Sequence, residues 1–189
     1  MKKKVLLIMP DAHMHKLRLG SFVRSSREAP LTLTTLAALV PSEGFDVKII
    51  DESIDKVPLD YPADLVGIST LTGTVRRAYE LAAHFKSRGS TIVLGGVHVT
   101  IMPEEARQYA DSIVVGMAER SWPRLLRDFL KGEMLKVYED EAAHTDDVLR
   151  DVPSPRMDLQ RRSGYMIPDT VQATRGCKHT CDFCSVPVV

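Results

Sequence analysis

Residues 65–96 read LVGISTLTGTVRRAYELAAHFKSRGSTIVLGG, and this stretch decides the fold. Short apolar runs of the kind found in buried strands stand at its two ends, at residues 65–69 and 91–94. Between them, residues 74–88 carry apolar side chains at helical spacing, which places on one face Ala78, Leu81, Ala82 and Phe85. The stretch therefore predicts two parallel strands joined by an amphipathic helix that packs against them.

The same alternation continues in both directions from this unit. Apolar runs predict three further strands, at residues 5–9, 47–50 and 113–115. Helical spacing predicts three further helices, at residues 31–40, 103–109 and 118–130. Together these elements predict an α/β fold over residues 1–138: a doubly wound, Rossmann-like (flavodoxin-like), five-stranded parallel sheet with helices on both faces.

The remainder of the 189-residue chain has a different character. Residues 139–168 are charged, contain Pro153 and Pro155 and lack periodicity, so we expect a linker there. Residues 170–174 could form a strand that leads into a cysteine-containing loop. Because such a strand has no visible partner, we expect residues 169–189 to be the incomplete start of a further domain.

Composition excludes several classes of protein. The chain has 25 Lys and Arg against 25 Asp and Glu, whereas nucleic-acid binders need a basic surplus, so we expect no nucleic-acid partner. No apolar stretch is long enough for a membrane span. The basic and apolar start stops at Pro10 with no small-residue cleavage site after it, so we expect a cytoplasmic protein.

In a doubly wound sheet, ligands bind beyond the carboxyl ends of the strands, so the residues that follow each strand are the candidate site. Hydroxyl groups there offer hydrogen bonds, and glycines let a bulky planar ligand approach the backbone. Caps of helices and tight turns remain the alternative roles for these residues. The candidates are Ser69, Thr70, Leu71, Thr72, Gly95, Gly96, Val97 and Gly116.

Three common functions of this fold lack their residues. A receiver domain needs a phosphorylatable Asp after the strand at 65–69, where this chain has Ser69 and Thr70. A flavodoxin needs a Ser/Thr/Gly phosphate loop after the first strand, but residues 10–16 read PDAHMHK. The same loop has no GxGxxG fingerprint for a dinucleotide.

The cysteines carry the strongest signal. Residues 1–176 contain none, and then Cys177, Cys181 and Cys184 form a CxxxCxxC motif. Three thiolates on one short loop can hold three corners of a four-iron cluster and leave the fourth iron open. A zinc site completed by His179, or thiols with no metal, are the alternatives.

Residues 174–184, TRGCKHTCDFC, resemble the opening of the radical S-adenosylmethionine (SAM) enzymes. Residues 5–138 resemble the cobalamin-binding domain that precedes the radical barrel in one large subgroup of that family. Within them, residues 95–105 are similar to that subgroup's loop after the fourth strand, and Ser69-Thr70-Leu71 matches the SxL element of cobalamin domains generally. On this resemblance, residues 169–189 are the first strand and the cluster loop of a truncated radical SAM barrel.

The resemblance implies the cofactors and the site. Cys177, Cys181 and Cys184 would hold a 4Fe-4S cluster that binds and reductively cleaves SAM, with Phe183 beside the adenine. Cobalamin would contact the strand-end residues named above. The full-length enzyme would use the radical for methyl transfer or cyclisation of a small-molecule substrate, with a reducing partner such as flavodoxin or ferredoxin. We expect this chain alone to be catalytically silent, because the rest of the barrel is absent from it.

One feature departs from the histidine-ligated cobalamin domains. Their DxHxxG motif is incomplete here, since Asp11 and His13 are followed by no glycine at the last position. We therefore expect neither His13, His15 nor His98 to be an axial ligand of cobalt. Two alternative functions remain: a non-catalytic corrinoid or small-ligand module with a metal-binding cysteine tail, and a radical SAM protein whose α/β domain binds no cobalamin.

Overall fold

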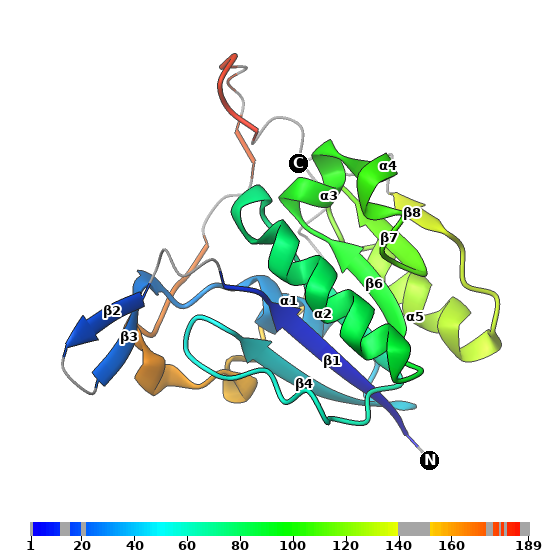
Figure 1. The fold of residues 1–189 in the computed structure, drawn as a ribbon, viewed down its shortest axis with the longest axis horizontal. Helices are drawn as coiled ribbons and strands as arrows, with labels where there is room; N and C mark the ends of the chain where they lie inside the picture. The colour runs from blue at the N-terminus through cyan, green and yellow to red at the C-terminus, as the bar shows by residue number, and fades with distance from the viewer. Residues whose placement is uncertain are drawn as a thin grey trace.

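The computed structural model describes residues 2–11, 16–19, 22–139, 152–172, 176–177, 179 and 181–185. Its main sheet has six strands in the order β4-β1-β5-β6-β7-β8, and all neighbouring strands are parallel (Figure 1). The strands are β1 (Lys3–Met9), β4 (Phe45–Asp51), β5 (Leu65–Ser69), β6 (Thr91–Gly95), β7 (Ser112–Val115) and β8 (Val137–Glu139). The chain order reverses at β1, as in flavodoxin-like sheets, and the predicted fold class is confirmed.

Helices cover both faces of the main sheet. They are α1 (Thr32–Ala38), α2 (Val75–Ser87), α3 (Val97–Ile101), α4 (Pro103–Ala106) and α5 (Ser121–Lys131), with a 3₁₀ turn, η1 (Thr72–Thr74), before α2. One buried core joins α2 to one face, and a second joins α1 and α5 to the other. Alternation within β1 shows the division, because Leu6 and Ile8 enter the first core while Val5 and Leu7 enter the second.

The prediction of five strands was wrong by one. β8 pairs in parallel with β7 and forms the edge of the sheet. It has only three residues, of which Tyr138 alone is buried, so it carries no apolar run. The second difference lies after β6, where the region expected to be a loop forms α3 and the helix expected at 103–109 ends at Ala106.

A second, three-stranded sheet was not predicted. It has the order β2-β3-β9, with β2 (Lys16–Leu19) antiparallel to β3 (Phe22–Glu28) and β9 (Tyr165–Ile167) parallel to β3. Figure 1 shows β2 and β3 projecting to one side of the main sheet. The sequence of β3 is FVRSSRE, in which residues of high β propensity do not alternate with polar ones. These strands therefore lack the pattern from which a strand is predicted.

The segment expected as a linker packs on the main domain where the structure describes it, from residue 152 on. It contains the 3₁₀ turns η2 (Met157–Leu159) and η3 (Arg162–Gly164), followed by β9. The Tyr165 hydroxyl donates to the Asp51 carboxylate at 2.8 Å, and a Cβ on Gly164 would lie 2.6 Å from Ile54. Residues 170–172 belong to no strand, and the rest of the strand expected at 170–174 lies outside the described residues.

Among the described residues, none of the helices combines the length and apolar character needed to cross a bilayer.

Candidate functional site

A cavity of about 490 Å³ lies at the carboxyl edge of the main sheet. Its walls come from the ends of β1, β5, β6 and β7 and from α1 and α5, which is where a doubly wound sheet binds its ligands. Of the eight candidate residues, six line it: Ser69, Leu71, Gly95, Gly96, Val97 and Gly116. The structure thus gathers into one site three loops that lie far apart in the sequence.

Sequence reasoning missed the floor of this cavity. Leu7, Val93, Val114 and Trp122 line it and are all at most 4% exposed. Gly67, in the middle of β5, makes room for them, because a Cβ there would lie 2.9 Å from Leu7 and 3.4 Å from the Trp122 ring. A glycine inside a strand is the sequence signal that could have revealed this close packing.

Trp122 lines the cavity, and the one polar group of its indole is already hydrogen-bonded. Its Nε1–H donates to the Leu36 carbonyl oxygen at 3.2 Å, which ties α5 to α1 in the cavity wall. This hydrogen bond uses the one donor that an indole has.

Gly96 brings the end of β6 against the loop after β5. It has φ +97° and ψ −178°, a conformation open to glycine alone, and a Cβ there would lie 2.7 Å from the Thr70 carbonyl oxygen. Two hydrogen bonds hold the contact: Thr70 N–H donates to the Gly95 carbonyl at 2.9 Å, and His98 N–H donates to the Thr70 carbonyl at 3.2 Å.

Thr70 and Thr72, the two candidates outside the cavity lining, stabilise its rim. The buried Thr70 hydroxyl lies 3.0 Å from that of Thr74, which also accepts the Leu71 N–H at 3.0 Å. Neither Thr70 nor Thr72 caps α2, whose N-cap is Thr74 without a side-chain cap. On the other side of Gly96, Thr100 accepts the Gly116 N–H at 2.9 Å and donates to the Gly96 carbonyl at 3.2 Å.

His98 is buried behind this rim and does not line the cavity. Its Nδ1 lies 3.2 Å from the Thr72 hydroxyl, and its Nε2 lies 3.5 Å from Oε1 of Glu105. The same Glu105 oxygen accepts the Tyr79 hydroxyl at 3.0 Å. Burial raises the pKa of Tyr79, and the Glu105 carboxylate raises it further. His98 therefore links the rim to α2 and α4, while His13 and His15 lie outside the described residues.

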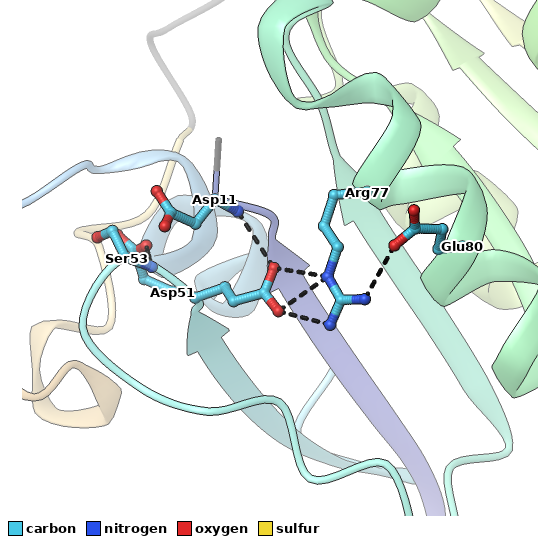
Figure 2. Close-up of polar contacts among 6 residues, drawn as sticks. Asp11, Asp51, Ser53, Arg77 and Glu80 are labelled. Carbon is cyan, nitrogen blue, oxygen red and sulfur yellow. Dashed lines mark hydrogen bonds and ion pairs between the residues drawn. The ribbon is translucent and has the colours of Figure 1, made fainter. Parts of the chain in front are cut away.

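A polar network fixes the neighbouring ends of β1 and β4 (Figure 2). The Glu52 carboxylate accepts the Asp11 N–H at 3.2 Å and the Arg77 guanidinium at 2.7 Å, and Arg77 also reaches Glu80 at 3.1 Å. The buried Asp51 accepts the Ser53 N–H at 2.8 Å in addition to Tyr165. These contacts join α2 and the 152–170 segment to the strand ends beside the cavity.

Cys177, Cys181 and Cys184 are exposed, free thiols. The Cys184 N–H donates to the Cys181 carbonyl at 3.0 Å, which makes a turn, and Phe183 is 93% exposed. No group of three His, Cys, Asp or Glu side chains within the described part of the chain is arranged to hold a metal ion. Gly176 and Ser185, at the two ends of the cysteine loop, nevertheless line the cavity.

Comparison with known proteins identifies the domain. A family model described as "B12 binding domain" matches residues 22–126, more than half of the chain. The chain belongs to the B12-binding domain family. The match spans most of the cavity wall, from β3 through the first half of α5.

The curated relatives of this chain include two methyltransferases of Chlorobaculum tepidum. Bacteriochlorophyllide d C-8(2)-methyltransferase is 34% identical over 86% of this chain and 37% of its own length. Bacteriochlorophyllide d C-12(1)-methyltransferase is 31% identical over 100% of this chain and 41% of its own length. The chain thus spans about two fifths of these relatives.

Among solved structures, the fold is similar to a radical S-adenosylmethionine methyltransferase, TsrM, from Kitasatospora setae. The form with tryptophan substrate and a SAM analogue matches with a TM-score of 0.59 and 18% identity, over 98% of this chain and 41% of TsrM. The form with cobalamin and a [4Fe-4S] cluster matches with a TM-score of 0.52 and 20% identity, over 75% of this chain and 26% of TsrM. At this identity, the likeness shows the shared fold.

Proposed function

We propose that this chain is the cobalamin-binding part of a radical SAM methyltransferase that acts on a small molecule. The observation that carries the proposal is the cavity at the carboxyl edge of the sheet, with five glycines in its walls: Gly67, Gly95, Gly96, Gly116 and Gly176. Family membership supports cobalamin as the ligand, and the methyltransferase relatives support the reaction class.

The size of the cavity suggests which part of cobalamin enters it. Pockets of roughly 300–1,000 Å³ bury drug-sized ligands, and the cavity is at the lower end of that range at about 490 Å³. Cobalamin is larger than such ligands, so only a part of it fits inside. Its nucleotide tail ends in a planar aromatic base, which suits a deep apolar cavity, and the corrin ring would then lie over the mouth.

The residues at the mouth have distinct parts in this proposal. Gly95, Gly96 and Gly116 keep the backbone free of side chains where the ligand approaches, and Ser69 supplies a hydroxyl. No histidine among the described residues lines the cavity. The expectation that no His of this domain is an axial ligand of cobalt still rests on the incomplete DxHxxG motif, because His13 and His15 lie outside the described residues.

For the cysteine loop we propose a 4Fe-4S cluster held by Cys177, Cys181 and Cys184, with SAM bound beside Phe183. Three free, exposed thiols within eight residues are the donor set that such a cluster needs. When bound, cobalamin would serve as a carrier of the methyl group, and the cluster would cleave SAM reductively. Because Gly176 and Ser185 border the cavity, this loop would lie near the corrin ring. A low-potential protein such as flavodoxin or ferredoxin would supply electrons.

The test of cobalamin binding is equilibrium dialysis of hydroxocobalamin against the 189-residue chain. Gly116→Leu should weaken binding at least about tenfold, because the new side chain stands in open space at the cavity wall. Gly89→Leu is the matched control: Gly89 also has a positive φ and open space within 4 Å of where a Cβ would stand, but it lies outside the cavity lining. Equal binding by both variants and the unsubstituted chain would overturn the assignment of the cavity.

The cluster is tested by anaerobic reconstitution with iron and sulfide. Replacing any of the three cysteines by Ala should lower the bound iron and the absorbance of the cluster near 400 nm. His179→Ala should change neither, whereas the alternative zinc site would depend on His179. Iron binding that persists without the three thiols would contradict the proposed cluster.

A further inference from the structure

We propose that the cavity selects corrinoids whose nucleotide ends in an apolar benzimidazole over those that end in a purine such as adenine. This inference rests on the proposed function, since it assumes that the nucleotide tail enters the cavity. It concerns the floor, where the outer edge of the base would lie.

The side chains that form the floor are apolar apart from the Trp122 Nε1–H. Leu7, Val93 and Val114 are buried aliphatic side chains, Gly67 has no side chain, and the Trp122 donor is already bonded to Leu36. The backbone N–H groups of these central strands face their neighbours within the parallel sheet. A polar atom of a ligand pressed against this floor would therefore lose its hydrogen bonds to water without replacement.

The hydroxyl groups of the cavity lie away from the floor or are already used. Ser69, Thr32, Thr35 and Ser185 are partly or fully exposed, so they belong to the mouth. The buried Thr74 hydroxyl donates to the Leu71 carbonyl oxygen at 3.1 Å and accepts the Leu71 N–H. None of these donors is placed to serve the edge of a base at the floor.

Glu119 is the buried charged residue of the lining, at 7% exposure. A carboxylate accepts hydrogen bonds and donates none. It can serve an amine or a ribose hydroxyl, but it repels the lone pairs of ring nitrogens. Glu119 therefore does not compensate for the buried acceptors of a purine.

The two kinds of base differ at the edge that enters first. The six-membered ring of dimethylbenzimidazole carries two methyl groups, which gain from contact with an apolar floor. The six-membered ring of adenine carries two acceptor nitrogens and an amine. Burying an acceptor without a donor costs about 1–3 kcal/mol, which corresponds to roughly 5-fold to 150-fold in affinity.

The experiment compares three corrinoids on the same 189-residue chain: cobalamin, its counterpart with adenine as the base, and cobinamide, which has no nucleotide. We expect the adenine counterpart to bind at least about fivefold more weakly than cobalamin. Equal affinity for these two would overturn the inference and leave cobalamin binding intact. Equal affinity for cobalamin and cobinamide would show that the tail stays outside the cavity, and this too overturns the inference. Binding of none of the three would overturn the proposed function itself.

A variant adds an independent test of the floor. Val114→Thr places a hydroxyl at the floor at nearly constant volume, so it should reduce the preference for cobalamin over the adenine counterpart by about threefold or more. Val66→Thr is the control, because Val66 is buried in the core on the other face of the sheet and should leave the ratio unchanged. If Val114→Thr leaves the ratio of the two affinities unchanged, or if both variants change it equally, the apolar floor is not the cause of the preference.

Discussion

Replacing Gly96 by Ala should destabilise the domain far more than the same replacement at Gly89. Both glycines have positive φ, +97° and +88°. At Gly89 an added Cβ would meet no atom within 4 Å, so the substitution introduces backbone strain but no steric clash. At Gly96 the Cβ would lie 2.7 Å from the carbonyl oxygen and 2.8 Å from the nitrogen of Thr70, and neither backbone atom can rotate away.

The magnitude follows from these contacts. Strain at a positive φ costs about 1–3 kcal/mol, and the loss of glycine's flexibility in the unfolded chain returns about 0.4–1 kcal/mol. Gly89→Ala should therefore cost about 1 kcal/mol. Gly96→Ala must also displace Thr70, which weakens two hydrogen bonds, to Gly95 and from His98, worth about 1 kcal/mol each. Its cost should be about 3 kcal/mol.

Urea unfolding of the two variants, followed by circular dichroism, measures this difference. A gap of about 2 kcal/mol corresponds to roughly 4–8 °C in Tm for a chain of this size. Gly96→Ala should also bind hydroxocobalamin more weakly under conditions where it is fully folded, because the displaced Thr70 loop forms the rim. Equal stability of the two variants would refute the close approach of the β5 and β6 ends.

Three further predictions concern other parts of the structure. Tyr165→Phe should lower the free energy of unfolding by about 1–3 kcal/mol, because it leaves the buried Asp51 carboxylate without this donor, whereas Tyr109→Phe on the surface should change it little in the same urea assay. For Asp111, burial opposes ionisation, but Lys86 and the Ile92 N–H outweigh it and the pKa is lowered. Its contribution to stability is therefore present above the unfolded-state pKa of about 3.9 and lost as pH falls through the lower folded value, so urea midpoints of Asp111→Asn and the unsubstituted chain should converge in acid. The electron paramagnetic resonance spectrum of bound cobalt(II) cobalamin should contain no nitrogen splitting that depends on His13, His15 or His98. A nitrogen splitting that is lost in His13→Ala, His15→Ala or His98→Ala would show that a histidine is an axial ligand and contradict this prediction.

The main sheet was predictable because its central strands are apolar runs that pack on both faces. β1, β5 and β6 match the predicted strands within two residues at each end, and α2 matches the predicted helix within one. β8 and β9 have three residues each and gain their stability from neighbouring strands rather than from their own sequence. Docking of residues 152–170 depends on contacts between distant parts of the chain, such as Tyr165 with Asp51, which no local pattern reveals.

The site was predictable at its rim and not at its floor. Strand ends are placed by the topology, so Ser69, Gly95, Gly96 and Gly116 could be named as candidates from the sequence. Trp122 and Leu36 come from helices whose rotation about their own axes is set by packing, so the hydrogen bond between them could not be inferred. Thr70 and His98 contribute through buried hydrogen bonds, which depend on three-dimensional distances.

The fluorescence of Trp122 tests the central claim most directly. It is the one tryptophan of the sequence, and it lines the proposed cobalamin cavity. Titration with hydroxocobalamin should quench its emission saturably, at one corrinoid per chain, in the unsubstituted protein and in Gly89→Leu, and much more weakly in Gly116→Leu. Free tryptophanamide at the same absorbance corrects for light absorbed by the corrinoid. Quenching that never saturates and matches that of free tryptophanamide would contradict cobalamin binding in this cavity.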